Sequence, residues 1–136
     1  MSDQLPTPAP VVNADAKAFW DATSEGRLLL QRCGRCSAVG WYPRALCPEC
    51  SASELDWFEA SGRGTIYSFT VIRRGAIGAY REAAPYVLAF VELEEGPRVL
   101  TNLVGFDLEA IRIGDEVRAV YHPTGEGSAL VRFRPA

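Results

Sequence analysis

The chain has 136 residues, of which 48% are hydrophobic and 23% charged, and its formal net charge at pH 7 is −3. This length and composition are typical of a folded protein that buries its own apolar core. The acidic balance argues against nucleic-acid binding, which usually needs a basic excess, and no apolar run reaches the roughly 18 residues that a membrane span requires.

Residues 1–12 are rich in proline and alanine, and we expect them to form a loose tail. They do not begin with basic residues followed by an apolar stretch, so they do not resemble a secretory signal. We therefore expect the protein to be cytoplasmic, where thiols stay reduced and disulfides are rare.

A short helix is expected after this tail, completing a first unit that covers residues 1–32. Asn13 or Asp15 is a candidate N-cap, and Gly26 is a candidate stop. The following stretch, RLLLQRC, is typical of a strand that leads into the cysteines.

All the cysteines of the chain lie in the next unit, residues 33–58, as two Cys-x-x-Cys pairs separated by ten residues: Cys33, Cys36, Cys47 and Cys50. Each pair can form a tight knuckle, and two facing knuckles supply the four thiolates that suit tetrahedral Zn²⁺. Such a site has no open position, so the metal would be structural. Two disulfides, free structural thiols and a mononuclear iron site are the alternatives.

Large side chains lie between the two cysteine pairs. Trp41, Tyr42 and Arg44 follow the first knuckle within nine residues of it. A zinc ribbon of this size can hide few large rings, so some exposure is expected. These residues are therefore candidates either for the small core of the ribbon or for a patch that docks a partner.

The sequence of residues 59–136 predicts short strands joined by turns. A hairpin is expected around Glu95-Gly96, and residues 107–114 are expected to form a turn or a short helical piece. Five strands with one short insert between the third and the fourth fit a small Greek-key barrel of the OB kind. The expected strands are 64–74, 86–96, 97–106, 115–123 and 128–135.

The loop after the first of these strands carries the candidate ligand-binding residues of the barrel: Arg73, Arg74, Tyr80 and Arg81. Guanidinium groups suit phosphate recognition, and in barrels of this type the neighbourhood is a common binding surface. The alternative is that the arginines are simply solvated and the aromatic residues fill the barrel.

No catalytic residue is assigned. His122 is the only histidine, and it precedes Pro123 at a strand end, which is usually a surface or edge position. The thiols are already assigned to a metal, and no nucleophile elbow, Walker loop or dinucleotide fingerprint occurs. If the chain were an enzyme in its own right, His122 would be the candidate to test.

The paired knuckles with YPR between them and the strand GTIYSFT resemble the acyl-CoA-associated family that joins a rubredoxin-like zinc ribbon to an OB-fold. The resemblance covers the chain from about residue 15 to its end. It implies a mainly β protein: an N-terminal tail and short helix (1–32), a zinc ribbon with one structural Zn²⁺ (33–58) and a five-stranded OB barrel (59–136).

This resemblance also implies a role. Members of the family are accessory subunits that bind and activate or stabilise a thiolase-superfamily partner, such as a thiolase, an acyltransferase or a thiolase-like aldolase. The partner acts on CoA thioesters in lipid or steroid side-chain metabolism, and the accessory chain can shape the acyl-CoA channel. A two-plus-two heterotetramer is the expected assembly, with acyl-CoA near the interface. The alternatives are a partner of an enoyl-CoA hydratase, a stand-alone acyl-CoA binder and a single-stranded nucleic-acid binder.

Overall fold

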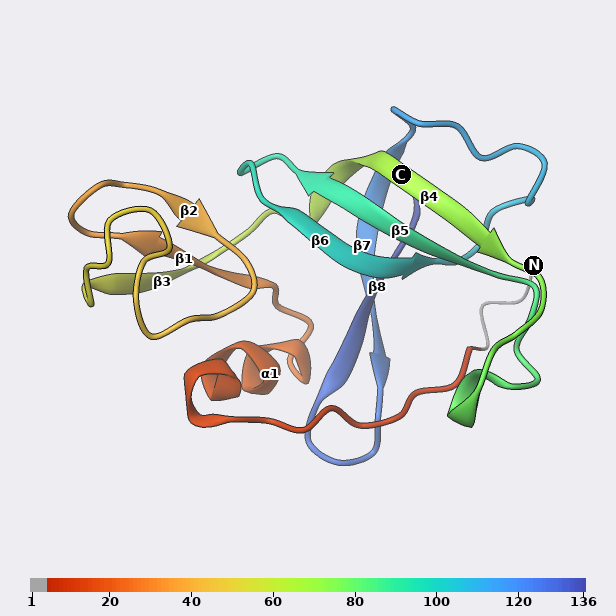
Figure 1. Ribbon diagram of the computed structural model, residues 1–136, viewed down its shortest axis with the longest axis horizontal. Helices are drawn as coiled ribbons and strands as arrows, with labels where there is room; N and C mark the ends of the chain where they lie inside the picture. The colour runs from red at the N-terminus through yellow and green to blue at the C-terminus, as the bar shows by residue number, and fades with distance from the viewer. Residues whose placement is uncertain (1–4) are drawn as a thin grey trace.

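The computed structural model describes residues 5–136 (Figure 1). The 3-10 turn η1 (Ala14–Ala16) leads into helix α1 (Lys17–Thr23). The side-chain oxygen of Asn13 accepts a 3.0 Å hydrogen bond from the backbone N–H of Ala16 and so caps η1. The N-cap position of α1 is Ala16, which makes no side-chain cap bond. Gly26, the expected stop, has a φ of 73°, in the left-handed region that favours glycine.

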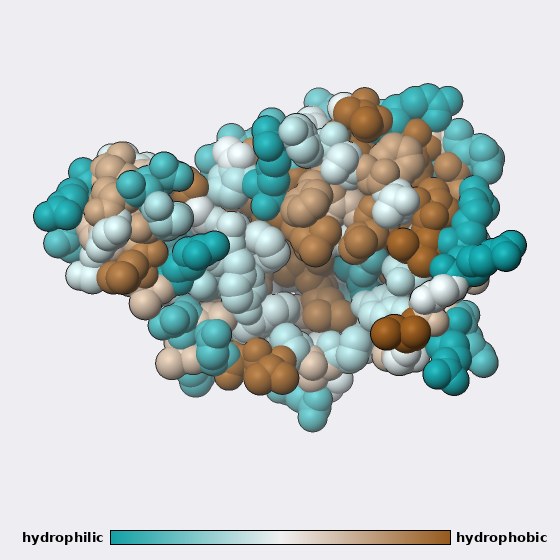
Figure 2. All heavy atoms as spheres, viewed as in Figure 1, coloured by the Kyte–Doolittle hydropathy of each residue, from teal (hydrophilic) through white to brown (hydrophobic). Residues whose placement is uncertain are grey.

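Three antiparallel strands form a small sheet in the order β2-β1-β3: β1 (Leu29–Cys33), β2 (Val39–Gly40) and β3 (Leu55–Glu59). Strand β3 was not predicted from the sequence. Each residue of β3 pairs with one of β1, from Leu29 opposite Glu59 to Cys33 opposite Leu55. This sheet forms a narrow lobe at one end of the molecule (Figure 2).

The other five strands close into a barrel in the order β4-β5-β6-β8-β7, so the predicted OB-type fold is confirmed. The β5–β6 hairpin turns around Glu95-Gly96 as expected, and residues 107–114 form turns without a helix. The strands are β4 (Arg63–Ile72), β5 (Tyr86–Leu93), β6 (Arg98–Leu103), β7 (Glu116–Pro123) and β8 (Ala129–Pro135).

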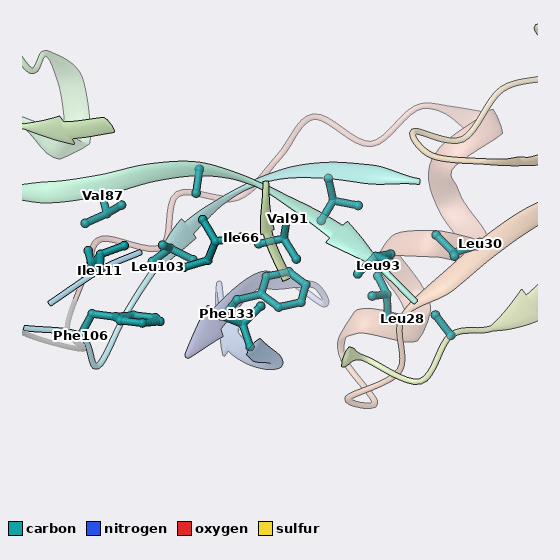
Figure 3. Packing of buried hydrophobic residues seen from close by; sticks show 14 of the residues in the cluster. Leu28, Leu30, Ile66, Val87, Val91, Leu93, Leu103, Phe106, Ile111 and Phe133 are labelled. Atoms are coloured by element: carbon teal, nitrogen blue, oxygen red, sulfur yellow. The ribbon is translucent and has the colours of Figure 1, made fainter. Parts of the chain in front are cut away.

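The core of the barrel comes from alternate residues of its strands. In β5, Val87, Ala89, Val91 and Leu93 are buried, because successive side chains of a strand point to opposite faces. Figure 3 shows Ile66, Val91, Leu103 and Phe133 directed toward a common interior. The same cluster extends to Leu28, Leu30 and Phe19, so the helix and the small sheet pack on the barrel as one unit.

Residues 5–12 form neither helix nor strand, yet their first residues are held in place. The side chain of Arg132 in β8 donates hydrogen bonds to the backbone carbonyls of Leu5 and Pro6, so this part of the expected loose tail is attached to the barrel. Residues 1–4 of that tail lie outside the described residues. Within residues 5–136, no helix combines the length and the apolar character needed to cross a bilayer.

Candidate metal centre and partner-binding surface

The four cysteine sulfurs converge on one point, within 4.8 Å of one another. The sulfurs of Cys33 and Cys50 are 3.6 Å apart, and those of Cys36 and Cys47 are also 3.6 Å apart. A tetrahedron with Zn–S bonds of about 2.3 Å has edges of about 3.8 Å. The residues present therefore fit one structural Zn²⁺, and the site leaves no position for a substrate or a water ligand.

The two knuckles have the same local structure. The N–H of the residue two positions after the first cysteine donates to its sulfur at 3.4 Å in both, from Arg35 to Cys33 and from Glu49 to Cys47. The residue after the second cysteine, a serine in each knuckle, has a φ of 66°. These turns direct backbone dipoles at the sulfurs and favour the thiolates that a metal needs.

The thiol pKa values show why the cluster needs a cation. The backbone N–H groups of Cys36 and Arg35 lower the pKa of Cys33 to about 7. The N–H of Ala38 also favours the thiolate of Cys36, but burial and the neighbouring sulfurs raise its pKa to about 12. Four adjacent thiolates repel one another, so a bound dication stabilises the fully ionised set.

Trp41 and Tyr42, candidates from the sequence, are half-buried and pack on helix α1. Their ring centroids lie 6.4 and 5.9 Å from that of Phe19. The indole N–H of Trp20 donates to the Tyr42 hydroxyl at 2.8 Å. These two aromatic side chains therefore connect the ribbon to the helix.

Arg44 follows Tyr42 by two residues, and its side chain is exposed. Its backbone is fixed to β1, because the amide of Gln31 accepts from the Arg44 N–H at 2.9 Å and donates to the Arg44 carbonyl at 3.1 Å. The guanidinium group is therefore presented from a rigid segment of the ribbon.

The loop between β4 and β5 presents its arginines outward and Tyr80 inward. Arg73, Arg74 and Arg81 are exposed, and Arg73 lies 3.8 Å from a carboxylate oxygen of Glu109. The Tyr80 hydroxyl accepts a 3.0 Å hydrogen bond from Arg132. The ribbon and this loop lie at opposite ends of the molecule (Figure 1), so Arg44 and the loop arginines do not form one cluster.

An exposed apolar surface on the outside of the barrel was not identified from the sequence. We call it the outer apolar face and define it as Leu88 and Phe90 of β5, Leu100 of β6 and Tyr67 of β4. Their exposed fractions are 36%, 42%, 49% and 46%. Phe90 pairs directly with Leu100, and apolar atoms gather over β4 and β5 in Figure 2. The sequence does indicate this face. In YVLAFVEL both sets of alternating positions are apolar, so both faces of the strand are expected to be apolar.

His122 is half-buried in β7, and a guanidinium nitrogen of Arg132 lies 2.9 Å from its Nδ1. Because a guanidinium only donates, Nδ1 is the acceptor here. Within residues 5–136, the four cysteines are the one group of three or more His, Cys, Asp or Glu side chains placed to share a metal ion.

Comparison with family models assigns both parts of the chain. Residues 20–56 match the rubredoxin-like zinc ribbon domain of ChsH2, and residues 57–122 match the C-terminal OB-fold domain of ChsH2. The four cysteines lie within the first of these matches.

Three curated relatives are similar in sequence. A probable enoyl-CoA hydratase alpha subunit of Thermomonospora curvata is 39% identical over 95% of this chain, which spans only 40% of that protein. A DUF35 domain-containing scaffold protein of Methanothermobacter thermautotrophicus is 41% identical over 70% of this chain and 71% of its own length. The benzoylsuccinyl-CoA thiolase subunit BbsA of Geobacter metallireducens is 33% identical over 68% of this chain and 60% of its own.

A solved structure described as an Ltp2-ChsH2(DUF35) aldolase superposes on this chain with a TM-score of 0.83 and 36% sequence identity. The match covers 93% of this chain and 98% of that one. The helix, the ribbon and the barrel are thus shared as one arrangement.

Proposed function

The chain belongs to the ChsH2 (DUF35) family of zinc-ribbon and OB-fold proteins, and we propose that it is a non-catalytic accessory subunit of an enzyme that acts on CoA thioesters. Its zinc site is closed and structural. Relatives of similar length carry the name scaffold protein, which supports an accessory role.

The observation that carries this proposal is the outer apolar face. The largest contiguous apolar patch on a soluble protein is often an interaction site. Leu88, Phe90 and Leu100 lie side by side around one shallow depression on β5 and β6. We propose that a partner enzyme covers this face, with Phe90 near the centre of the contact.

The proposed partner is a thiolase-superfamily enzyme: a thiolase, an acyltransferase or a thiolase-like aldolase in lipid or steroid side-chain metabolism. A relative named as a thiolase subunit and a similar structure named as an aldolase support this choice. Because such a partner would offer the same patch on each copy of a symmetric dimer, we propose a two-plus-two assembly. A four-thiolate site suits a compartment where thiols stay reduced, so we place the complex in the cytoplasm.

The residues singled out in the sequence have separate proposed roles in this assembly. Trp41 and Tyr42 hold the ribbon on α1 as a rigid arm, and Arg44 extends from that arm toward the partner. The exposed guanidinium groups of Arg73, Arg74 and Arg81 line the entrance for acyl-CoA, where they can receive its phosphates. Tyr80 fixes their loop to the barrel through Arg132.

An enoyl-CoA hydratase is the alternative partner. It is supported by a relative named as a hydratase alpha subunit, which matches almost the whole of this chain. In that protein the matching region is 40% of a longer chain.

The proposal is tested by comparing the zinc-loaded chain alone with the chain added to a candidate partner. We expect no turnover of acetoacetyl-CoA or crotonyl-CoA by the isolated chain. We expect a rise in the activity or soluble yield of the co-expressed partner. Turnover by the isolated chain that is lost in His122→Ala would contradict the accessory role.

A further inference from the structure

Two buried hydrogen-bond donors without a partner belong to residues of one cavity. Within residues 5–136, the buried side-chain polar atoms that lack a hydrogen bond are Trp41 Nε1, Glu95 Oε1 and Arg132 Nε. Trp41 and Arg132 both line a cavity of about 160 Å³ between the helix, the ribbon and the barrel. Buried donors are nearly always paired, and a ligand in this cavity that carries acceptor atoms would be placed next to both residues.

The walls of this cavity are mostly apolar. They come from Phe19 and Trp20 of α1, Val99 of β6, and Leu130 and Val131 of β8. Figure 2 shows the surface hollowed in the region between α1 and the barrel, with apolar atoms on its floor. A cavity of about 150 Å³ accepts a molecule the size of benzene. The body of the ligand is therefore apolar and about as large as one six-membered ring.

The charge on Arg132 indicates what the acceptor should be. Its side chain is among the most buried of the protein, with 1% of the residue exposed. Among residues 5–136, the hydrogen-bond partners of its terminal nitrogens carry no negative charge: they are the carbonyls of Leu5 and Pro6, His122 Nδ1 and the Tyr80 hydroxyl.

The ion pairs formed within residues 5–136 do not include this arginine. Among the described residues this buried cation therefore has no counter-charge, and its Nε–H has no acceptor. An uncompensated buried charge is unfavourable. An anionic acceptor in the cavity would supply the missing charge.

We propose that this cavity binds a small carboxylate with an apolar body of about one ring, such as an aromatic or branched aliphatic acid. The carboxylate pairs with Arg132, and the indole N–H of Trp41 is the second donor to the ligand. All the residues that line the cavity belong to this chain, and one of them, Leu100, is also part of the outer apolar face. The ligand of the cavity can therefore be tested on the isolated protein.

The direct test is a titration of the zinc-loaded, ¹⁵N-labelled full chain with benzoate, followed through the indole N–H signals of its three tryptophans. Trp41 is assigned with Trp41→Phe. Trp57, which does not line the cavity, is assigned with Trp57→Phe and serves as the internal control. We expect a saturable shift of the Trp41 signal, with the Trp57 signal unchanged.

Benzyl alcohol, which has the same ring without the charge, is the matched probe. We expect its affinity to be lower by about tenfold, because a charge-assisted hydrogen bond is about twice as strong as a neutral one. Equal affinity for the two probes, or the absence of a saturable Trp41 shift with benzoate, would overturn the proposal.

Trp41→Phe keeps an aromatic ring and removes only the N–H. In this variant, measured by calorimetry, we expect the benzoate affinity to fall several-fold while zinc content and melting temperature stay close to those of the parent. Unchanged benzoate affinity in the folded variant would overturn the assignment of Trp41 as a donor to the ligand.

Discussion

The indole nitrogen of Trp20 in α1 donates a 2.8 Å hydrogen bond to the hydroxyl of Tyr42 in the ribbon. Both rings also lie edge-on to Phe19, with centroid distances of 5.0 Å for Trp20 and 5.9 Å for Tyr42. Because Phe19 belongs to the core of the barrel, this contact joins helix, ribbon and barrel. The ribbon is therefore a fixed arm of the protein.

Tyr42→Phe tests this connection. It removes the acceptor of the Trp20 indole and should lower the free energy of unfolding by about 1 kcal/mol. Urea denaturation followed by tryptophan fluorescence measures the change. Tyr67→Phe, at an exposed tyrosine of the outer apolar face, is the matched control and should have the stability of the parent. Equal stability of both variants would show that the Trp20–Tyr42 bond does not hold the ribbon.

Cys47→Ser tests the structural role of the metal. It removes one of the four thiolates, so we expect the purified protein to lose its equivalent of zinc. We also expect the ribbon to unfold, because structural zinc supplies about 10 kcal/mol or more of folding energy in small domains. Zinc analysis and near-ultraviolet circular dichroism measure the two effects. Ser53→Ala, at an exposed serine of the same ribbon, should retain the metal. A Cys47→Ser protein with a full equivalent of zinc would contradict the assignment.

Gly64→Ala tests the close packing of β4 against β5. A Cβ at this position would lie 2.5 Å from the carbonyl oxygen of Glu92 and 2.8 Å from a methyl carbon of Val91. We expect a loss of stability of about 1–3 kcal/mol, as in other overpacked cores. Gly40→Ala is the control, because a Cβ there meets no atom within 4 Å. Equal melting temperatures of the two variants would be inconsistent with this packing.

The double variant Arg73→Ala, Arg74→Ala tests the proposed entrance for acyl-CoA. If these guanidinium groups receive the phosphates of CoA, the variant should raise the KM of the complex for its CoA thioester severalfold, with the complex still intact. Arg118→Ala, at an exposed position of β7, controls for the loss of positive charge. A KM equal to that of the parent complex would show that the loop does not contact the CoA thioester.

Features encoded by neighbouring residues were predictable. The cysteine knuckles span four residues each, and their spacing, together with the expected reducing compartment, predicted the zinc site. The barrel strands follow from alternating apolar residues and from turn signals such as Glu95-Gly96. The strand β3 was missed because it is stabilised by pairing with β1, which lies more than twenty positions earlier.

Other features depend on contacts that no local pattern contains. Arg132 holds Pro6 across 126 positions of sequence, so the attachment of the N-terminal segment was not visible. Whether Trp41 and Tyr42 were core or surface was left open, because their contact with α1 is also distant in sequence. The outer apolar face could have been found, since Leu88 and Phe90 alternate with the buried residues of β5.

The proposed accessory role requires this chain to bind an acyl-CoA enzyme through its outer apolar face. Affinity purification of the tagged chain from its native cells, with quantitative mass spectrometry, tests it most directly when Phe90→Asp and Ile113→Asp are purified in parallel. Both sites are exposed, with fractions of 42% and 68%, but Ile113 lies in the turn before β7 and is not one of the residues that define the face.

We predict that a thiolase-superfamily enzyme is recovered in near-equal amount with the parent and with Ile113→Asp. With a folded, zinc-loaded Phe90→Asp protein it should be depleted by at least about 30-fold, the loss expected of a residue that contributes about 2 kcal/mol to binding. Recovery of the chain alone, recovery with nucleic acid, or equal recovery of the enzyme with Phe90→Asp would contradict the claim.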